Sequence, residues 1–198
     1  MANFLKAHKH IYKAEGGYTN NPNDSGNYVD GELIGTNYGI SAPVLKSYLG
    51  RTPSVSDMIN LKYSDALKIY KHEYWDRING DNIKNQDVAL LIYDGAVNQG
   101  LGAIKRMVDK SLARQGKLFD NFSKDIKSIN NSNQRKLFND IWQERYSSYS
   151  KGQAEFRQGW ISRLEDIKYG NRTGLYIILG LSLIFATTGF IYYKKLTK

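Results

Sequence analysis

Residues 18–40 of this 198-residue chain disfavour a helix, whereas most of the remainder repeats apolar residues at helical spacing. Asn, Gly, Asp and Ser dominate this stretch, and short apolar pairs occur at Tyr28-Val29 and Leu33-Ile34. Such residues favour turns, and two short apolar segments between turns indicate a small β-hairpin. We therefore expect a mainly helical α+β body with one β element near residues 18–40.

Helical periodicity lies on both sides of this stretch. An apolar face that includes Phe4 and Ile11 predicts a helix over residues 3–14, which Gly16-Gly17 ends. The strongest buried helix is predicted over residues 86–99, because apolar residues cover much of its circumference before Gly100. Further helices are predicted around residues 63–75, 103–112, 138–146 and 156–164, with a polar connection over residues 121–133.

The carboxy-terminal segment from Leu175 to Tyr193 carries no charge. As a helix it would span roughly 28 Å, close to the hydrocarbon thickness of a bilayer. Tyr192 lies where interfacial aromatic residues occur, and lysines follow it. We expect one transmembrane anchor here, with its orientation left open because basic residues flank both sides. The amino terminus lacks the basic start and apolar core of a cleavable signal peptide.

Charge and cysteine content narrow the function classes. The net charge of +9 favours an anionic partner, but the basic residues are spread along the chain without a nucleic-acid motif, so no nucleic-acid partner is expected. The absence of cysteine excludes a disulfide framework, a thiolate metal site and a Cys nucleophile. His72-Glu73 lacks the HExxH spacing, and the acids of residues 18–40 do not follow EF-hand spacing. No metal or cofactor is expected.

Two acids form the candidate catalytic pair. Glu15 follows Ile11 by four residues, at the end of the first helix's apolar face, where partial desolvation would raise its pKa as a general acid requires. Asp24 is expected to be exposed and ionised, and so able to activate water. Two carboxylates across a cleft suffice for glycoside hydrolysis. Asp30 and Glu32 are rivals of Asp24 in the same stretch.

Other polar residues are candidates for water or substrate contacts. Thr36 could hold a water or its own loop, and Asn37 and Tyr38 could contact sugar. Asp94 and Asn98 lie four residues apart on one face of the predicted buried helix. Polar groups there are either buried and paired or directed into a cleft, and both alternatives stay open.

These motifs resemble the phage-type and bacterial N-acetylmuramidases of glycoside hydrolase family 108. The resemblance spans about residues 3–168. It is carried by Glu15-Gly16-Gly17-Tyr18, Asn21-Pro22-Asn23-Asp24, Thr36-Asn37-Tyr38-Gly39-Ile40, Tyr74-Trp75-Asp76, residues 94–100 and residues 159–163. It implies a lysozyme-like fold with a catalytic region over residues 1–99 and a helical, peptidoglycan-binding-like region over residues 100–170.

The resemblance also implies roles for particular residues. Glu15 matches the catalytic acid, and Asp24 and Thr36 match the second acid and the threonine of a pattern shared with phage lysozymes. Residues 27–34 lengthen the usual link between the last two, which makes Asp30 a substitute for Asp24. Substrate contacts are expected from Tyr18, Asn37, Tyr38, Asp94 and Asn98.

The expected function is hydrolysis of the β-1,4 bond between N-acetylmuramic acid and N-acetylglucosamine in bacterial peptidoglycan. Glu15 would protonate the leaving oxygen, and Asp24 would activate water or stabilise the oxocarbenium-like charge, with inversion preferred. The body is expected to act on the cell-wall side of the membrane. Two alternatives are a non-catalytic, membrane-tethered peptidoglycan-binding module and a membrane-perturbing lysis or secretion component.

Overall fold

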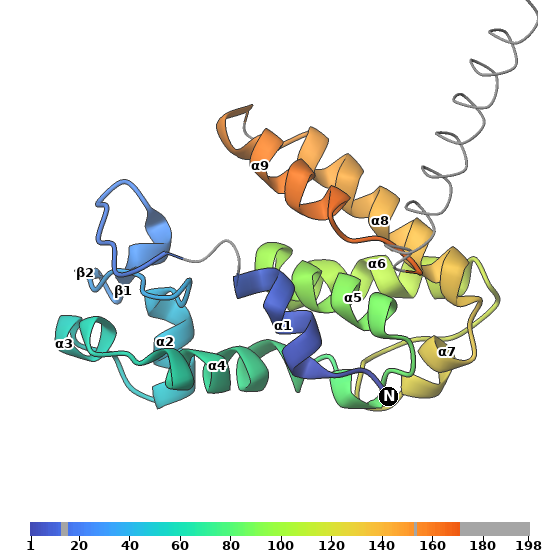
Figure 1. Cartoon of the computed structure of the whole chain (residues 1–198), viewed down its shortest axis with the longest axis horizontal. Coiled ribbons are helices and arrows are strands. Elements are labelled where there is room, and N and C mark those ends of the chain that lie inside the picture. Colours follow the sequence, from blue (N-terminus) through green and yellow to red (C-terminus); the bar gives the residue numbers. More distant parts are fainter. Residues whose placement is uncertain (13–15, 153, 171–198) are drawn as a thin grey trace, which may run out of the picture. The chain divides into compact units, whose positions relative to one another are not determined.

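The structure is a computed structural model that describes residues 1–12, 16–152 and 154–170 (Figure 1). Its elements are mainly helical. In chain order they are α1 (Phe4–Tyr12), η1 (Ser25–Asn27), β1 (Tyr28–Val29), β2 (Glu32–Leu33), α2 (Ala42–Leu49), α3 (Val55–Ile59), α4 (Tyr63–Tyr70), η2 (Lys71–Trp75), η3 (Gly80–Asn82), α5 (Gln86–Gln99), α6 (Leu101–Ala113), α7 (Ile126–Asn130), α8 (Gln134–Ser150) and α9 (Ala154–Glu165). Residues 1–167 form one compact unit.

Helix α5 is the core of this unit, and it contacts α1, α6, α8 and η2. Its start and end agree with the prediction for residues 86–99. Asn85 caps the first turn, because its side-chain oxygen accepts hydrogen bonds from the backbone N–H groups of Asp87 and Val88. At the other end Gly100 adopts a φ of +83°, which stops the helix.

The predicted β-hairpin is present and short. Strands β1 and β2 pair antiparallel, with Tyr28 opposite Leu33 and Val29 opposite Glu32. Asp30 and Gly31 connect them with φ angles of +52° and +84°. Two consecutive residues with positive φ are typical of the type I′ turn, whose twist matches that of the strands. A mainly helical body with one small β element is therefore confirmed.

Two segments differ from the prediction in detail. The helix that starts at Tyr63 continues into a π-helical turn, η2, in which the backbone N–H of Asp76 donates to the carbonyl of Lys71. The connection over residues 121–133 is not simply polar. It contains the short helix α7, and Ile129 on that helix is fully buried. Burial of Ile129 stabilises this turn of helix, which the polar residues around it did not predict.

The predicted membrane anchor, from Leu175 to Tyr193, lies outside the described residues. None of the helices that the structure does describe combines the length and apolar character needed to cross a bilayer. The predicted boundary between residues 99 and 100 stays a prediction. Across it, α6 and α8 pack directly on α5 within the same compact unit.

Candidate active site

A backbone bridge joins the two halves of the candidate catalytic motif. Thr19 and Thr36 form an antiparallel bridge in which each N–H donates to the other's carbonyl at 2.8 Å. Thr19 follows the Glu15-Gly16-Gly17-Tyr18 motif, and Thr36 is the threonine that the sequence predicted for the site. Glu15 itself lies outside the described residues. The bridge holds the chain that follows Gly17 beside Thr36.

Gly35 is required next to this bridge. It has a φ of +95°, and a Cβ atom there would lie 2.6 Å from Cε2 of Tyr18 and 2.7 Å from the carbonyl oxygen of Thr19. Both distances are far below van der Waals contact, so only glycine fits. Tyr18 is half-buried over this glycine, and its hydroxyl donates to the carbonyl oxygen of Ile34 at 3.3 Å.

A tight turn follows Thr36 and orients the next two predicted residues. Asn37 pairs with Ile40, and Tyr38 between them has a φ of +49°. Asn37 is 5% exposed, and its side-chain amide donates to the carbonyl oxygen of Met58 at 2.9 Å. That donor fastens the turn to α3. Tyr38 is half-buried, and its carbonyl oxygen accepts a hydrogen bond from the hydroxyl of Tyr70.

Asp24 is exposed and begins η1 as its N-cap residue. Its Oδ1 accepts a hydrogen bond from the backbone N–H of Gly26 at 2.9 Å. Among the described residues no hydrogen bond to Oδ2 is found. A carboxylate held at one oxygen and free at the other has a fixed direction and can still accept a proton from water.

The residues that lengthen the link between Asp24 and Thr36 fold onto themselves. The carbonyl oxygen of Asn27 accepts hydrogen bonds from the N–H groups of both Ile34 and Gly35, at 2.9 and 3.0 Å. The two ends of the insertion therefore meet, and the hairpin between them adds length without separating residues 27 and 34.

Asp30, the rival second acid, is engaged elsewhere. Lys46 Nζ lies 2.7 Å from each of its carboxylate oxygens, and the Thr52 hydroxyl donates to Oδ2 at 2.5 Å. These hydrogen bonds lower the pKa of Asp30. Both oxygens are occupied by protein donors, so this carboxylate serves the attachment of the hairpin to α2 and to the loop after it.

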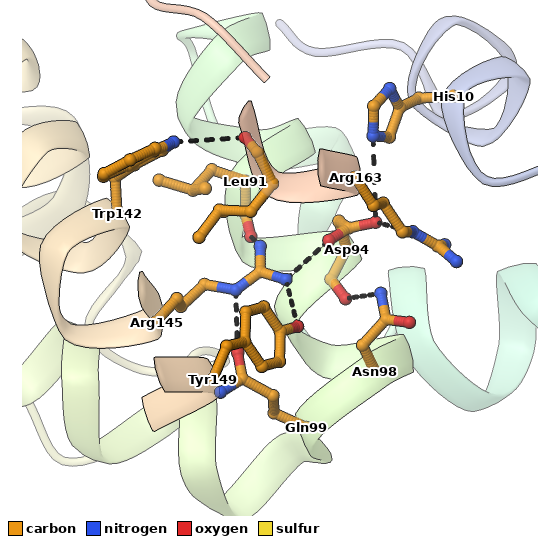
Figure 2. Close-up of polar contacts among 10 residues, drawn as sticks. His10, Leu91, Asp94, Asn98, Gln99, Trp142, Arg145, Tyr149 and Arg163 are labelled. Atoms are coloured by element: carbon orange, nitrogen blue, oxygen red, sulfur yellow. Dashed lines mark hydrogen bonds and ion pairs between the residues drawn. The ribbon is translucent and has the colours of Figure 1, made fainter. Parts of the chain in front are cut away.

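Asp94 takes the first of its two predicted alternatives, because it is fully buried and paired. Figure 2 shows two arginines and a histidine converging on its carboxylate. Arg145 Nη2 lies 2.5 Å from Oδ2, and Arg163 Nε lies 2.9 Å from Oδ1. His10 Nε2 lies 4.0 Å from Oδ1. Burial alone would raise the pKa of Asp94, but the two arginine charges outweigh it and lower the pKa.

Arg145 is itself fully buried and makes several further contacts. Its Nε donates to the side-chain oxygen of Gln99 at 2.8 Å, its Nη1 to the carbonyl of Leu91 at 3.0 Å, and its Nη2 to the hydroxyl of Tyr149 at 2.9 Å (Figure 2). A buried guanidinium with partners on all three nitrogens is the condition under which such an ion pair is tolerated. The cluster joins α5 to α8 and α9.

The sequence analysis did not identify Arg145 and Arg163 as partners of Asp94. A signal existed for Arg145, which lies four residues from both Ile141 and Tyr149 on an otherwise apolar helical face. Asn98, the other predicted residue of α5, is exposed, and its side-chain amide donates to the carbonyl oxygen of Asp94 at 2.7 Å.

A second buried acid was considered in the sequence only as an improbable zinc ligand. Glu73, on η2, is 6% exposed and lines a surface pocket of about 200 Å³. No spacing rule predicts this placement, since it depends on the π-helical turn. Among the described residues no three His, Cys, Asp or Glu side chains gather so that they could hold a metal ion.

Comparison with known proteins adds to this geometry. Residues 8–100 match the sequence model of the family described as glycosyl hydrolase 108. A similar solved structure is that of SagA from Brucella abortus, with a TM-score of 0.65 and 27% sequence identity over 83% of this chain and 90% of that chain. No curated protein matches the chain.

Proposed function

Residues 8–100 place the chain in glycosyl hydrolase family 108, so it is a glycoside hydrolase, and we propose that it is an N-acetylmuramidase. Membership of this family indicates peptidoglycan as the substrate. The bond we propose is the β-1,4 linkage between N-acetylmuramic acid and N-acetylglucosamine.

Glu15 is the proposed general acid, which protonates the leaving oxygen as the glycosidic bond breaks. The observation that supports this assignment best is the bridge between Thr19 and Thr36. It ties the chain just after the Glu15 motif to the threonine of the same pattern, as a site assembled from both segments requires. Thr36 is proposed to orient the attacking water with its hydroxyl.

Asp24 is the proposed second acid. One of its oxygens is held by Gly26, which fixes the carboxylate, and the other is free of protein donors among the described residues. An exposed carboxylate suits activation of water on the opposite face of the sugar ring, the arrangement of an inverting enzyme. Asp30 is a weaker candidate, because Lys46 and Thr52 occupy its oxygens.

The remaining expectations are kept as proposals. Tyr18, Tyr38 and Asn98 are proposed to contact the glycan, whereas the polar groups of Asn37 and Asp94 serve contacts within the protein. Residues 100–170 are proposed as the peptidoglycan-binding-like region. The segment from Leu175 to Tyr193 is proposed to anchor the body at the membrane on its cell-wall side.

The test compares the full chain with its Glu15→Gln variant on purified peptidoglycan. New reducing ends are reduced with borohydride and identified by mass spectrometry, which distinguishes a muramidase from a glucosaminidase. We expect muramitol ends from the parent, at least a hundredfold fewer from Glu15→Gln, and parental amounts from the control Asp65→Asn, whose carboxylate pairs with Lys68 on α4. Binding to the wall without reducing ends in any sample would contradict the proposal and leave a binding module.

A further inference from the structure

Glu73 is buried and lines a pocket that the proposed mechanism does not use. The hydroxyl of Ser47 donates to its Oε2 at 3.0 Å, and Nη1 of Arg77 lies 3.4 Å from the same oxygen. His72 Nδ1 lies 2.9 Å from Oε1. Burying a carboxylate is unfavourable unless it is paired, and apolar side chains of similar volume often pack as stably as a buried ion pair. Ser47, Arg77 and His72 supply that pairing. Among the described residues Oε1 has one of these partners and Oε2 has two, so Oε1 can accept a further hydrogen bond from a ligand in the pocket.

The rest of the pocket is mainly apolar. Val44 and Pro43 come from α2, Tyr74 from η2 and Leu101 from the first turn of α6, while Arg77 lies at the edge with an exposed side chain. Apolar walls around a few polar groups are typical of small-ligand sites. The volume, about 200 Å³, is enough for one sugar ring together with ordered water.

Two features connect this pocket with the proposed active site. Glu73 and Tyr74 belong to the π-helical turn η2, and π-helical turns occur frequently at functional sites. In addition, α2 begins at Ala42, directly after the turn that carries Thr36 and Tyr38, and the hydroxyl of Tyr70 on α4 donates to the carbonyl of Tyr38. The elements that form the pocket are thus fastened to the loop of the proposed site.

The charges at the pocket select the class of ligand. The Arg77 guanidinium already faces the Glu73 carboxylate, so a further cationic group gains little there. Neutral donors gain more, because a carboxylate accepts strong hydrogen bonds from hydroxyl and amide groups. A sugar ring offers both kinds of surface, with hydroxyl and N-acetyl donors at its edge and C–H groups on its faces for Val44 and Leu101.

We propose that this pocket is a glycan subsite, in which Glu73 accepts hydrogen bonds from one N-acetylated sugar of the substrate chain. The proposal rests on the proposed function, since the glycan is the one that the enzyme cleaves. Glu73 is a binding residue and takes no part in breaking the glycosidic bond. Its loss therefore weakens binding and raises KM, while kcat stays close to that of the parent.

The test has two measurements. Calorimetry measures binding of tetra-N-acetylchitotetraose to the full chain carrying Glu15→Gln, which prevents cleavage, and kinetics on peptidoglycan measure KM in the parent background. Glu73→Gln is expected to weaken binding at least tenfold and to raise KM at least tenfold. The matched control is Asp57→Asn, because Asp57 also accepts from a serine hydroxyl and faces an arginine, Ser54 and Arg51, but lies on α3 outside the pocket. The control should bind as the parent does.

A second variant separates binding from folding. Val44→Phe fills the pocket from α2 and leaves the contacts of Glu73 with Ser47 and Arg77 in place, so it should also weaken binding at least tenfold. If both variants keep parental affinity and Glu73→Gln lowers only the melting temperature, Glu73 is a structural group and the subsite is refuted. A parent that binds the tetramer but releases no reducing ends would overturn the proposed function and leave the subsite standing.

Discussion

Asp24 and Asp94 both belong to motifs that resemble one family, yet the structure gives them opposite surroundings. Asp24 lies in the loop region of residues 18–40, where it is exposed and accepts one backbone hydrogen bond. Asp94 lies in the helical cluster of α5, α8 and α9, where it is fully buried between two arginines. The residue type within a motif is therefore a poor guide to its chemistry, since burial and partners decide whether an acid can reach a substrate.

The two regions also differ in what holds them together. The loop region depends on backbone hydrogen bonds between short segments, such as the bridge between Thr19 and Thr36. The helical cluster depends on charge-assisted side-chain contacts that join elements far apart in the sequence, from Asp94 to Arg163. Removing an acid should therefore reduce activity in the first region and stability in the second.

The largest effect is expected for Asp24→Asn, which sharpens the comparison directly. The variant keeps the hydrogen bond from Gly26 but cannot accept a proton from water, so the rate of reducing-end release should fall about 10²- to 10⁴-fold. Its melting temperature should stay that of the parent. Asp30→Asn is the matched control in the same loop, and a loss of activity as large as that of Asp24→Asn would exchange the roles of the two acids.

The second effect concerns Asp94→Asn. The variant leaves the buried Arg145 and the half-buried Arg163 without their counter-charge, and we expect a loss of about 3–5 kcal/mol in the free energy of unfolding. Chemical denaturation with far-UV circular dichroism measures it. The folded fraction, assayed well below the melting temperature, should keep parental activity. A variant as stable as the parent but inactive would move Asp94 into the active site and break the comparison.

The third prediction concerns how the free energy of unfolding depends on pH through His8, a buried group of the helical core. Burial lowers the pKa of His8 to about 4, and Tyr93 shares a hydrogen bond with its Nδ1. The unfolded chain binds a proton near pH 6.5 that the folded chain binds only near pH 4, so the free energy of unfolding should fall as pH drops between these values. The expected loss is about 3 kcal/mol. His8→Gln should lack this pH dependence, whereas an unchanged slope would assign it to other groups.

The smallest of these effects tests the loop region from within. Gly35→Ala introduces a Cβ atom against Tyr18 and the carbonyl of Thr19, so it should weaken the Thr19 bridge and lower stability by about 2 kcal/mol, together with activity. Gly31→Ala is the matched control. Gly31 also has a positive φ, but a Cβ there meets nothing within 4 Å. It should cost about 1 kcal/mol and leave activity unchanged. Equal effects of the two substitutions would show that the bridge is not essential.

Much of the fold could be predicted from local pattern. The start and end of α5 follow from Asn85, an apolar run and Gly100, and the hairpin follows from Asp30-Gly31 between short apolar pairs. Such features depend on residues close in sequence, whose preferences act without the rest of the fold. The short helix α7 was missed because its one buried residue, Ile129, has a partner surface elsewhere in the chain.

The same distinction between local preference and distant contacts applies to the candidate site. The sequence by itself supplied the acids and the two ends of α5, because these express local backbone preference and side-chain chemistry. Tertiary structure alone decided that Asp94 is enclosed by Arg145 and Arg163, that Asp30 is held by Lys46, and that Glu73 lines a pocket. The physical reason is that desolvation and ion pairing depend on which side chains, distant in the sequence, pack against a residue. A local sequence pattern does not predict those partners.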